Sequence, residues 1–299
     1  YIPQWRRHCL LRPRMNRFSF SLLVSLVGET FLFAEILAQA PVPMDGQRID
    51  VDIYVNIYIL NPDRNTLKLF TRGPTPAREI GGAGWENDQL DRPAGIWARN
   101  GIDVFVADYG NHRIQRFDRN LNYVSTLRTR ENPNPDERFG YPTDVALSRL
   151  GDLFICDTEN SRIVKVNRFT LLERTFGGFG AGRGRLYSPA QVECGPQDHV
   201  YVVDGARILV FDNFGNFLRD LLAGALHPPL SLYASTAGIM VIDSATVFCF
   251  DKDERPVCSL PVVETVGMKG SDVRSFAFSQ DSIFVLGRKG VLTVPRIGR

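Results

Sequence analysis

The sequence predicts an all-β fold assembled from repeated units of about four antiparallel strands. The first observation is that Asp103–Asp118 alternates apolar and polar residues on both sides of the tetrapeptide Tyr109–His112. Alternation with period two around a turn containing Gly and Asn is typical of two strands in a hairpin. The other two observations are that this stretch recurs along the chain and that a second mark precedes each copy at a fixed distance.

The hairpin pattern occurs four times. Asp152–Asn167 is a second copy, His199–Asp212 is a third with a turn two residues shorter, and a weaker fourth surrounds Asp243. The shared polar residues are Asp108, Asn111 and Arg113, then Asp157, Asn160 and Arg162, and then Asp204 and Arg207. We expect Tyr109, Gly110 and Asn111 to form the first turn, since Gly and Asn tolerate positive φ.

The second mark is a proline 15 residues before the motif aspartate of each copy. These prolines are Pro93, Pro142, Pro189 and Pro228. The same spacing places Gly46 before Asn61 and Ser271 before Leu286, which gives six units whose first residues lie 39 to 49 positions apart. A single unit cannot bury both of its faces, so radial stacking follows. A two-sheet sandwich would not need the fixed spacing, and we therefore predict a six-bladed β-propeller.

The repeated residues also resemble a known family. The pattern F/L-x-x-P followed by V-x-D-x-x-N-x-R-I is similar to the NHL repeat, and NHL domains are typically six-bladed propellers. The resemblance is strongest over residues 81–219, weaker over 220–260, and limited to the spacing over 46–80 and 270–299.

The two ends of the predicted ring are irregular. Residues 47–60 read as the first two strands of blade one, which Leu67–Thr71 and Arg78–Ile80 complete. A fourth strand begins about 13 residues after each motif aspartate, so the sixth blade has only three strands of its own. We expect residues 41–45 to run beside 291–295 and close the ring, because prolines are tolerated in an edge strand.

The N-terminal part predicts export. We expect residues 1–14 to be an over-extended or disordered N-terminus, 15–40 to be a signal peptide or a signal anchor, and 41–299 to be the propeller. Met15 and Arg17 precede the apolar run Phe18–Val27, and Ala38–Ala40 forms an A-x-A cleavage site. The protein is then secreted or periplasmic, with a membrane attachment only if the segment stays uncleaved.

The cysteines left after export are Cys156, Cys194, Cys249 and Cys258. A hairpin around Lys252–Arg255 would place Cys249 opposite Cys258, so a disulfide is one option and two free thiols the other. Cys156 occupies an apolar strand position and is expected to be buried.

Composition and motifs argue against nucleic-acid binding and against catalysis by the repeated residues. The net charge is +2, which does not favour a general nucleic-acid binder. The repeated Asp–Arg pairs could suggest catalysis, but a feature present in several blades is better explained as structural. If exposed, each pair would contribute about 0.2–1 kcal/mol.

The NHL resemblance suggests a test for an enzyme. In the amidating lyases that such propellers resemble, metal-binding histidines follow the blade-opening proline, whereas here those positions are Ala94, Thr143, Ala190 and Pro229. Of the acids, only Asp144 and Glu193 are placed on first strands, at different depths. We therefore expect no metal, no cofactor and no catalytic residues. A lyase- or lactonase-like propeller with a channel metal is the alternative.

The function class that remains is the binding of a ligand without catalysis. Inter-blade loops and second-to-third-strand turns emerge on one face of a propeller, and Tyr, Trp and Arg are enriched at binding hot spots. The candidate ligand-binding residues are Trp85, Tyr109, Arg138, Tyr141, Arg183, Arg185 and Tyr187. We expect a monomeric binding or scaffold module for a protein or glycan ligand. RNA binding, known in some intracellular NHL proteins, is opposed by the charge and the signal segment.

Overall fold

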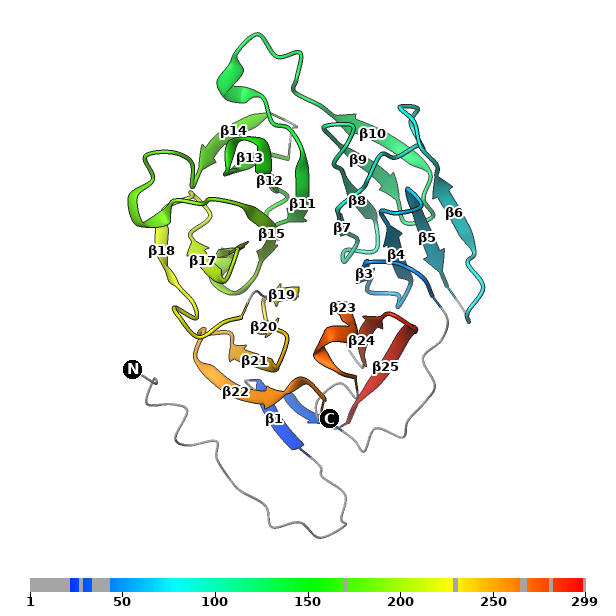
Figure 1. Ribbon diagram of the computed structural model, residues 1–299, viewed down its shortest axis with the longest axis vertical. Helices are drawn as coiled ribbons and strands as arrows, with labels where there is room; N and C mark the ends of the chain where they lie inside the picture. Colours follow the sequence, from blue (N-terminus) through cyan, green and yellow to red (C-terminus); the bar gives the residue numbers. More distant parts are fainter. Residues whose placement is uncertain are drawn as a thin grey trace.

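The computed structural model is a six-bladed β-propeller, as predicted (Figure 1). It describes residues 22–26, 29–33, 44–71, 73–168, 171–227, 231–263, 268–279 and 282–297. Six antiparallel sheets surround a central channel, and the first strand of each sheet lies nearest the centre. The blade-opening Pro228 and its neighbour Pro229 lie outside the described residues.

Blades one to three each have four strands in chain order. Blade one consists of β3 (Arg48–Val51), β4 (Ile57–Asn61), β5 (Thr66–Phe70) and β6 (Arg78–Gly81). Blade two consists of β7 (Gly95–Trp97), β8 (Asp103–Asp108), β9 (Arg113–Asp118) and β10 (Tyr123–Leu127). Blade three consists of β11 (Pro142–Leu147), β12 (Leu153–Asp157), β13 (Arg162–Val166) and β14 (Leu172–Phe176).

The other three blades follow the same order. Blade four consists of β15 (Pro189–Cys194), β16 (Val200–Asp204), β17 (Arg207–Phe211) and β18 (Phe217–Asp220). Blade five consists of β19 (Ser231–Ser235), β20 (Gly238–Ile242), β21 (Thr246–Asp251) and β22 (Pro256–Pro261). Blade six begins with β23 (Val273–Phe278), β24 (Ser282–Gly287) and β25 (Gly290–Ile297).

Strand alternation explains how the blades stack. In β8, Val104 and Val106 are buried in a cluster with Tyr58 of blade one. The intervening Phe105 and Ala107 are buried in a different cluster, which contains side chains of blade three. Successive side chains of a strand point to opposite faces, so one strand contributes to both inter-blade cores.

The hairpin turn differs from the prediction in one respect. The residue with positive φ is His112 (φ 50°) in blade two and Ser161 (φ 50°) in blade three, rather than Gly110 or Asn111. Gly110 is needed for space, because a Cβ there would lie 2.0 Å from a carboxylate oxygen of Asp91. Asn111 contributes its side-chain amide, as described below.

Blade six has three strands of its own, as predicted, and its outer strand pairs with a segment from before blade one. The partner of β25 is β2 (Glu29–Phe33), through Leu32 opposite Ile297, and β2 pairs in turn with β1 (Leu22–Leu26). The prediction that residues 41–45 run beside 291–295 falls largely on residues 41–43, which lie outside the described residues, and it stays a prediction.

The segment before blade one makes a different contact. Residues 44 and 45 form no strand, and residues 41–43 lie outside the described residues. Met44 is buried in a cluster with Ile59, Phe284 and Val291, between blades one and six. The expected cleavage site after Ala40 also lies outside the described part of the chain. No helix within that part is long and apolar enough to cross a membrane.

The cysteines resolve the open question of pairing. Cys249 and Cys258 face each other on β21 and β22 and form a disulfide. Cys156 is completely buried, as predicted, while Cys194 is half-buried, and both are free thiols.

Candidate functional site

The Asp–Arg pair of blade two lies inside the protein and holds the loop that enters the blade. The buried carboxylate of Asp108 accepts hydrogen bonds from Nε of Arg113 (2.7 Å) and from the Asn111 amide (2.9 Å). Its other oxygen accepts the N–H of Asp91 (2.8 Å). The remaining nitrogens of Arg113 donate to three loop carbonyl oxygens, those of Trp85, Glu86 and Gln89.

Blade three repeats this arrangement. Asp157 accepts hydrogen bonds from Nε of Arg162 and from the Asn160 amide, both at 2.8 Å. The N–H of Gly140, in the entering loop, donates to the second carboxylate oxygen (3.1 Å). Arg162 also donates to the carbonyl oxygen of Arg138 (2.7 Å).

Blade four keeps the arrangement despite its shorter turn. Asp204 pairs with Arg207 and accepts the N–H groups of Tyr187 (2.9 Å) and Ser188 (2.6 Å). Arg207 donates to the carbonyl oxygen of Arg185 (3.1 Å). The repeat motif therefore fixes the backbone of the loops that carry several of the candidate ligand-binding residues.

Two groups of candidate side chains come together on the loop face. In the first, the rings of Tyr109 and Tyr141 have centroids 5.1 Å apart, and the His112 ring is 4.1 Å from that of Tyr141. The guanidinium of Arg92 lies 5.4 Å from the Tyr109 ring, and that of Arg130 lies 5.8 Å from the Tyr141 ring. Such distances are within the range of cation–π attraction.

Hydrogen bonds fix the protonation of His112 within this group. Its Nδ1 accepts the N–H of Tyr141 at 3.1 Å, and a guanidinium nitrogen of Arg130 lies at the same distance. Burial and the positive charge of Arg130 lower the pKa of His112 below its usual value. The imidazole is therefore neutral at pH 7, with its proton on Nε2.

The second group lies on the loop before blade four. Arg185 is stacked near the rings of Phe179 (4.8 Å) and Tyr187 (5.1 Å), and Arg207 approaches Tyr187 from its own blade (5.4 Å). Tyr187 remains 63% exposed.

The other candidates are placed apart from these groups. Trp85 is 63% exposed on the loop before blade two. Arg138 donates from Nε to the carbonyl oxygen of Asn132 in its own loop (2.7 Å), and Arg183 lies over Phe217 on the outer strand of blade four. The seven residues thus form no single patch.

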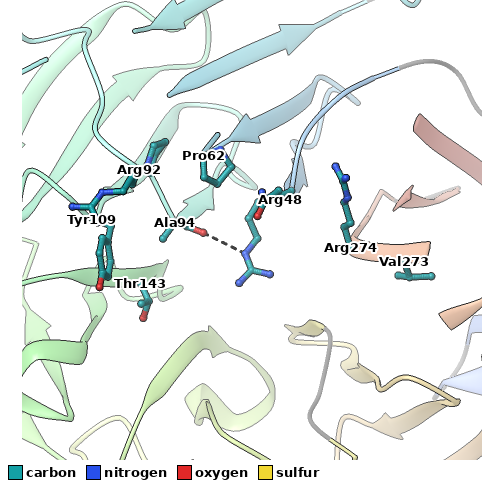
Figure 2. A pocket seen from close by; sticks show the side chains of 10 residues that line it. Arg48, Pro62, Arg92, Ala94, Tyr109, Thr143, Val273 and Arg274 are labelled. Atoms are coloured by element: carbon teal, nitrogen blue, oxygen red, sulfur yellow. Dashed lines mark hydrogen bonds between the residues drawn. The ribbon is translucent and has the colours of Figure 1, made fainter. Parts of the chain in front are cut away.

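A cavity of about 510 Å³ opens at the mouth of the channel, beside the first group. Figure 2 shows Arg48 reaching into it between Ala94 and Arg274, with Arg92 and Tyr109 beyond Ala94, on the side away from Arg274. The lining residues are Gln47, Arg48, Pro62, Arg92, Pro93, Ala94, Tyr109, Thr143, Val273 and Arg274. Apart from Tyr109, sequence reasoning had selected none of them as ligand-binding.

Arg99 ties the inner strands together across the channel. Its guanidinium, on the turn after β7, donates to both carboxylate oxygens of Glu193 (2.8 and 2.6 Å) and to Asp50 (3.2 Å). It also donates to the carbonyl oxygen of Ala234 (3.0 Å) and lies over the Tyr233 ring (4.3 Å). These partners belong to blades one, four and five. Asp50 is a first-strand acid that the sequence analysis overlooked.

Burial alters the acids of the channel. Burial raises the pKa of Asp144 to about 7, although the charge of Arg48 and the Val192 N–H, which donates to Asp144 (3.0 Å), oppose the rise. Burial likewise raises the pKa of Glu193, and the two contacts from Arg99 oppose it. The described residues contain no group of three or more His, Cys, Asp and Glu side chains that could hold a metal ion.

The positions after the blade-opening prolines do reach the channel mouth. Ala94 and Thr143 both line the cavity, and the Thr143 hydroxyl donates to the carbonyl oxygen of Pro189 (2.9 Å). His199 and His227 do not line this cavity. Nδ1 of His199 lies 2.5 Å from a carboxylate oxygen of Glu254, and Nδ1 of His227 lies 3.6 Å from one of Asp243.

Comparison with known proteins agrees with the fold. The NHL repeat model matches residues 139–166. Protein brain tumor of Drosophila melanogaster is 28% identical over 145 residues, which are 47% of this chain and 13% of that protein. A probable peptidyl-alpha-hydroxyglycine alpha-amidating lyase of Caenorhabditis elegans is 36% identical over 76 residues, 24% of this chain and 22% of that protein.

Each match thus spans less than a quarter of the curated relative. Among solved structures, a gluconolactonase from Xanthomonas campestris is similar, with a TM-score of 0.61 and 12% identity, over 96% of this chain and 99% of that one. An identity this low shows the fold alone. The chain is therefore a six-bladed β-propeller, and its residues 139–166 match the NHL repeat.

Proposed function

We propose that this propeller is an exported, non-catalytic binding module that engages a protein or glycan partner through its loop face. The observation that carries the proposal is the use of the motif arginines. Arg113, Arg162 and Arg207 each donate to a backbone carbonyl of an entering loop, and so hold Trp85, Arg138 and Arg185 in place. Loops fixed in this way present aromatic and arginine side chains with little entropy left to lose on binding.

Two exposed aromatic residues allow a direct test. Trp85→Ala and Tyr187→Ala each remove a side chain that is 63% exposed on the loop face. Phe214→Ala is the matched control, because Phe214 is 60% exposed on the turn between β17 and β18, at the opposite end of the blade. The three variants and the parent are screened by biolayer interferometry against the same panel of purified secreted proteins and immobilised glycans.

We expect ligands that bind the parent and Phe214→Ala but are weakened about tenfold or more by a loop-face substitution, as for an interface hot spot. Ligands that depend on Phe214 and ignore both loop-face variants would place the binding surface elsewhere and refute the proposal.

Export is a separate part of the proposal. It rests on the basic start, apolar run and A-x-A site of residues 15–40. Cleavage at this site would remove β1 and β2 from the edge of blade six, and N-terminal sequencing of secreted material should then begin near Pro41. A cytoplasmic product that retains Met15 would refute it.

The alternative is a propeller enzyme of the lyase or lactonase kind with a metal in the channel. Metal analysis of the purified, dialysed protein distinguishes the two. The binding-module proposal expects no stoichiometric metal, whereas one tightly held divalent ion per chain would favour the enzyme.

A further inference from the structure

The channel mouth holds three arginines from three blades around one cavity. Arg48 comes from β3 of blade one, Arg92 from the loop entering blade two, and Arg274 from β23 of blade six. None of the residues that line this cavity is acidic. We propose that the cavity is a binding site for a multiply charged oxyanionic group, carboxylate or phosphate.

Arg48 is the central residue of this site. Its Nε donates to the carbonyl oxygen of Ala94 (3.3 Å), which fixes the side chain over the channel (Figure 2). Within the described part of the chain, Arg48 forms no ion pair. A guanidinium has five donor N–H groups in a planar fork, so the terminal nitrogens stay available for a bidentate contact with an oxyanion.

The other two arginines are held at the rim by weak partners. Arg274 donates to the carbonyl oxygen of Gly46 (2.5 Å) and lies 3.7 Å from the exposed carboxylate of Asp45. Arg92 lies 3.5 Å from the carboxylate of Asp91 and packs over the Tyr109 ring. The two exposed ion pairs, Arg274–Asp45 and Arg92–Asp91, contribute about 0–1 kcal/mol each, so a ligand with two or more charges can replace them.

The acids below the mouth do not neutralise it. Asp50 and Glu193 are both engaged by Arg99. Asp144 is buried against Gly95, accepts the Val192 N–H and interacts electrostatically with Arg48, but among the described residues it forms no ion pair with that arginine. The field at the mouth is therefore set by the arginines, and a cleft lined by one sign of charge concentrates ligands of the opposite sign.

The volume of the cavity and its uncharged lining residues indicate what kind of ligand fits. A volume of about 510 Å³ is within the range of small-molecule sites. The Tyr109 ring and two prolines, Pro62 and Pro93, supply apolar contact. The oxyanion can be a free small molecule or an acidic group of a larger partner. The site goes beyond the proposed function, because the loop-face residues Trp85 and Tyr187 do not line it.

Isothermal titration calorimetry at low ionic strength tests the site. The free-anion probes are citrate and inorganic pyrophosphate, and the macromolecular probe is a hexaglutamate peptide with hexaglutamine as its neutral counterpart. The variants are Arg48→Gln and Arg274→Gln. Arg149→Gln is the control, since Arg149 is an exposed arginine on the β11–β12 turn, at the other end of the channel, where it pairs with Asp198.

We expect saturable binding of at least one anionic probe, no binding of hexaglutamine, and an increase in Kd of about tenfold or more for Arg48→Gln. Arg149→Gln should change Kd less than about twofold. Binding of citrate or pyrophosphate indicates a free ligand, and binding of hexaglutamate alone indicates an acidic partner.

The proposal fails if no anionic probe binds, or if Arg149→Gln weakens binding as much as Arg48→Gln. If Arg48→Gln does not fold by circular dichroism, the same comparison is made with Arg274→Gln. Because these probes and variants leave Trp85 and Tyr187 untouched, failure here leaves the loop-face proposal standing, and the reverse also holds.

Discussion

Asp157 is a completely buried carboxylate whose charge is met by Arg162, which is itself largely buried. Removing one partner of such a pair leaves the other charge buried and unpaired. We therefore expect Asp157→Ala to lower the free energy of unfolding by about 3–5 kcal/mol, well above the value for an exposed pair. Chemical denaturation monitored by circular dichroism measures the difference.

An exposed ion pair serves as the control for this measurement. Asp198 pairs with Arg149 at 2.7 Å near the surface, so Asp198→Ala should cost no more than about 1 kcal/mol. The double variant Asp157→Ala with Arg162→Met should regain part of the loss, because no charge is left buried. Equal costs for Asp157→Ala and Asp198→Ala would contradict the interpretation.

Sequence reasoning found the residues that recur and missed those that do not. Asp108, Asp157 and Asp204 were identified by spacing alone. Arg48 and Arg274 were missed because only the positions directly after the blade-opening prolines were considered, and these arginines lie two and three residues after Gly46 and Ser271. Arg99 belongs to no repeated pattern, and the sequence analysis did not select it. Only the fold shows that its guanidinium crosses the channel to Glu193.

The carboxyl group of Asp144 makes stability depend on pH. Its pKa is about 7 in the folded protein and lies near 3.8 when exposed, so between these values the folded state binds more protons than the unfolded state. Stability from this group is complete at low pH and is lost as pH rises through about 7. In Asp144→Asn the side chain cannot titrate, so the stability of the variant does not fall with pH through this group.

Thermal unfolding of the parent and Asp144→Asn over a pH series measures the effect. The Tm of the variant minus that of the parent should increase by several degrees from about pH 5 to about pH 8. The amide oxygen of asparagine can still accept the Val192 N–H, so the fold is kept. A difference that stays constant with pH would show that Asp144 does not titrate in this range.

At the scale of the element, the disulfide joins the outer strands of blade five. Cys249 and Cys258 are both buried and lie nine positions apart in the sequence. Closing a loop of this length restricts the unfolded chain by about 2–3 kcal/mol. We expect the double variant Cys249→Ala with Cys258→Ala to lose about this much stability in urea.

Reduction provides the control for the disulfide. Dithiothreitol should lower the stability of the parent towards that of the double variant and leave the variant unchanged. The free thiols Cys156 and Cys194 are present in both proteins, so they cannot account for a difference. A parent that is insensitive to the reductant, once reduction is verified by thiol titration, would refute the expectation.

The elements were predicted best where the repeat is strongest. β8 and β9 have the limits that the alternation of Asp103–Asp118 indicates, since each strand buries both faces between blades. The edge of blade six was not predictable in this way. An outer strand is fixed mainly by backbone pairing, and the pairing of β2 with β25 joins segments more than 250 residues apart in the chain.

At the scale of the whole molecule, side chains of the inner strands bond to the backbone of other blades. Asp50 accepts the N–H of Ala98 (2.8 Å), and the Gln191 amide exchanges two hydrogen bonds with Leu232 (2.7 and 3.0 Å). The N–H of Ile49 lies 3.5 Å from the Ser275 hydroxyl oxygen, which links blade one to blade six. Each such bond orients a neighbouring inner strand, and Arg99 connects strands on opposite sides of the ring.

Arg99 therefore provides the last prediction, on the cohesion of the ring. Replacing it by methionine leaves Asp50 and Glu193 buried without their cation, which should lower the free energy of unfolding by about 3–5 kcal/mol. In the triple variant Arg99→Met, Asp50→Asn and Glu193→Gln, the channel holds no uncompensated charge from this cluster, and most of that loss should be recovered. Denaturant unfolding of the parent and both variants measures this. If Arg99→Met has the same free energy of unfolding as the parent, the guanidinium does not hold the blades together. If the triple variant is no better than the single one, packing of Arg99 over the Tyr233 ring, rather than its charge, is what stabilises the channel.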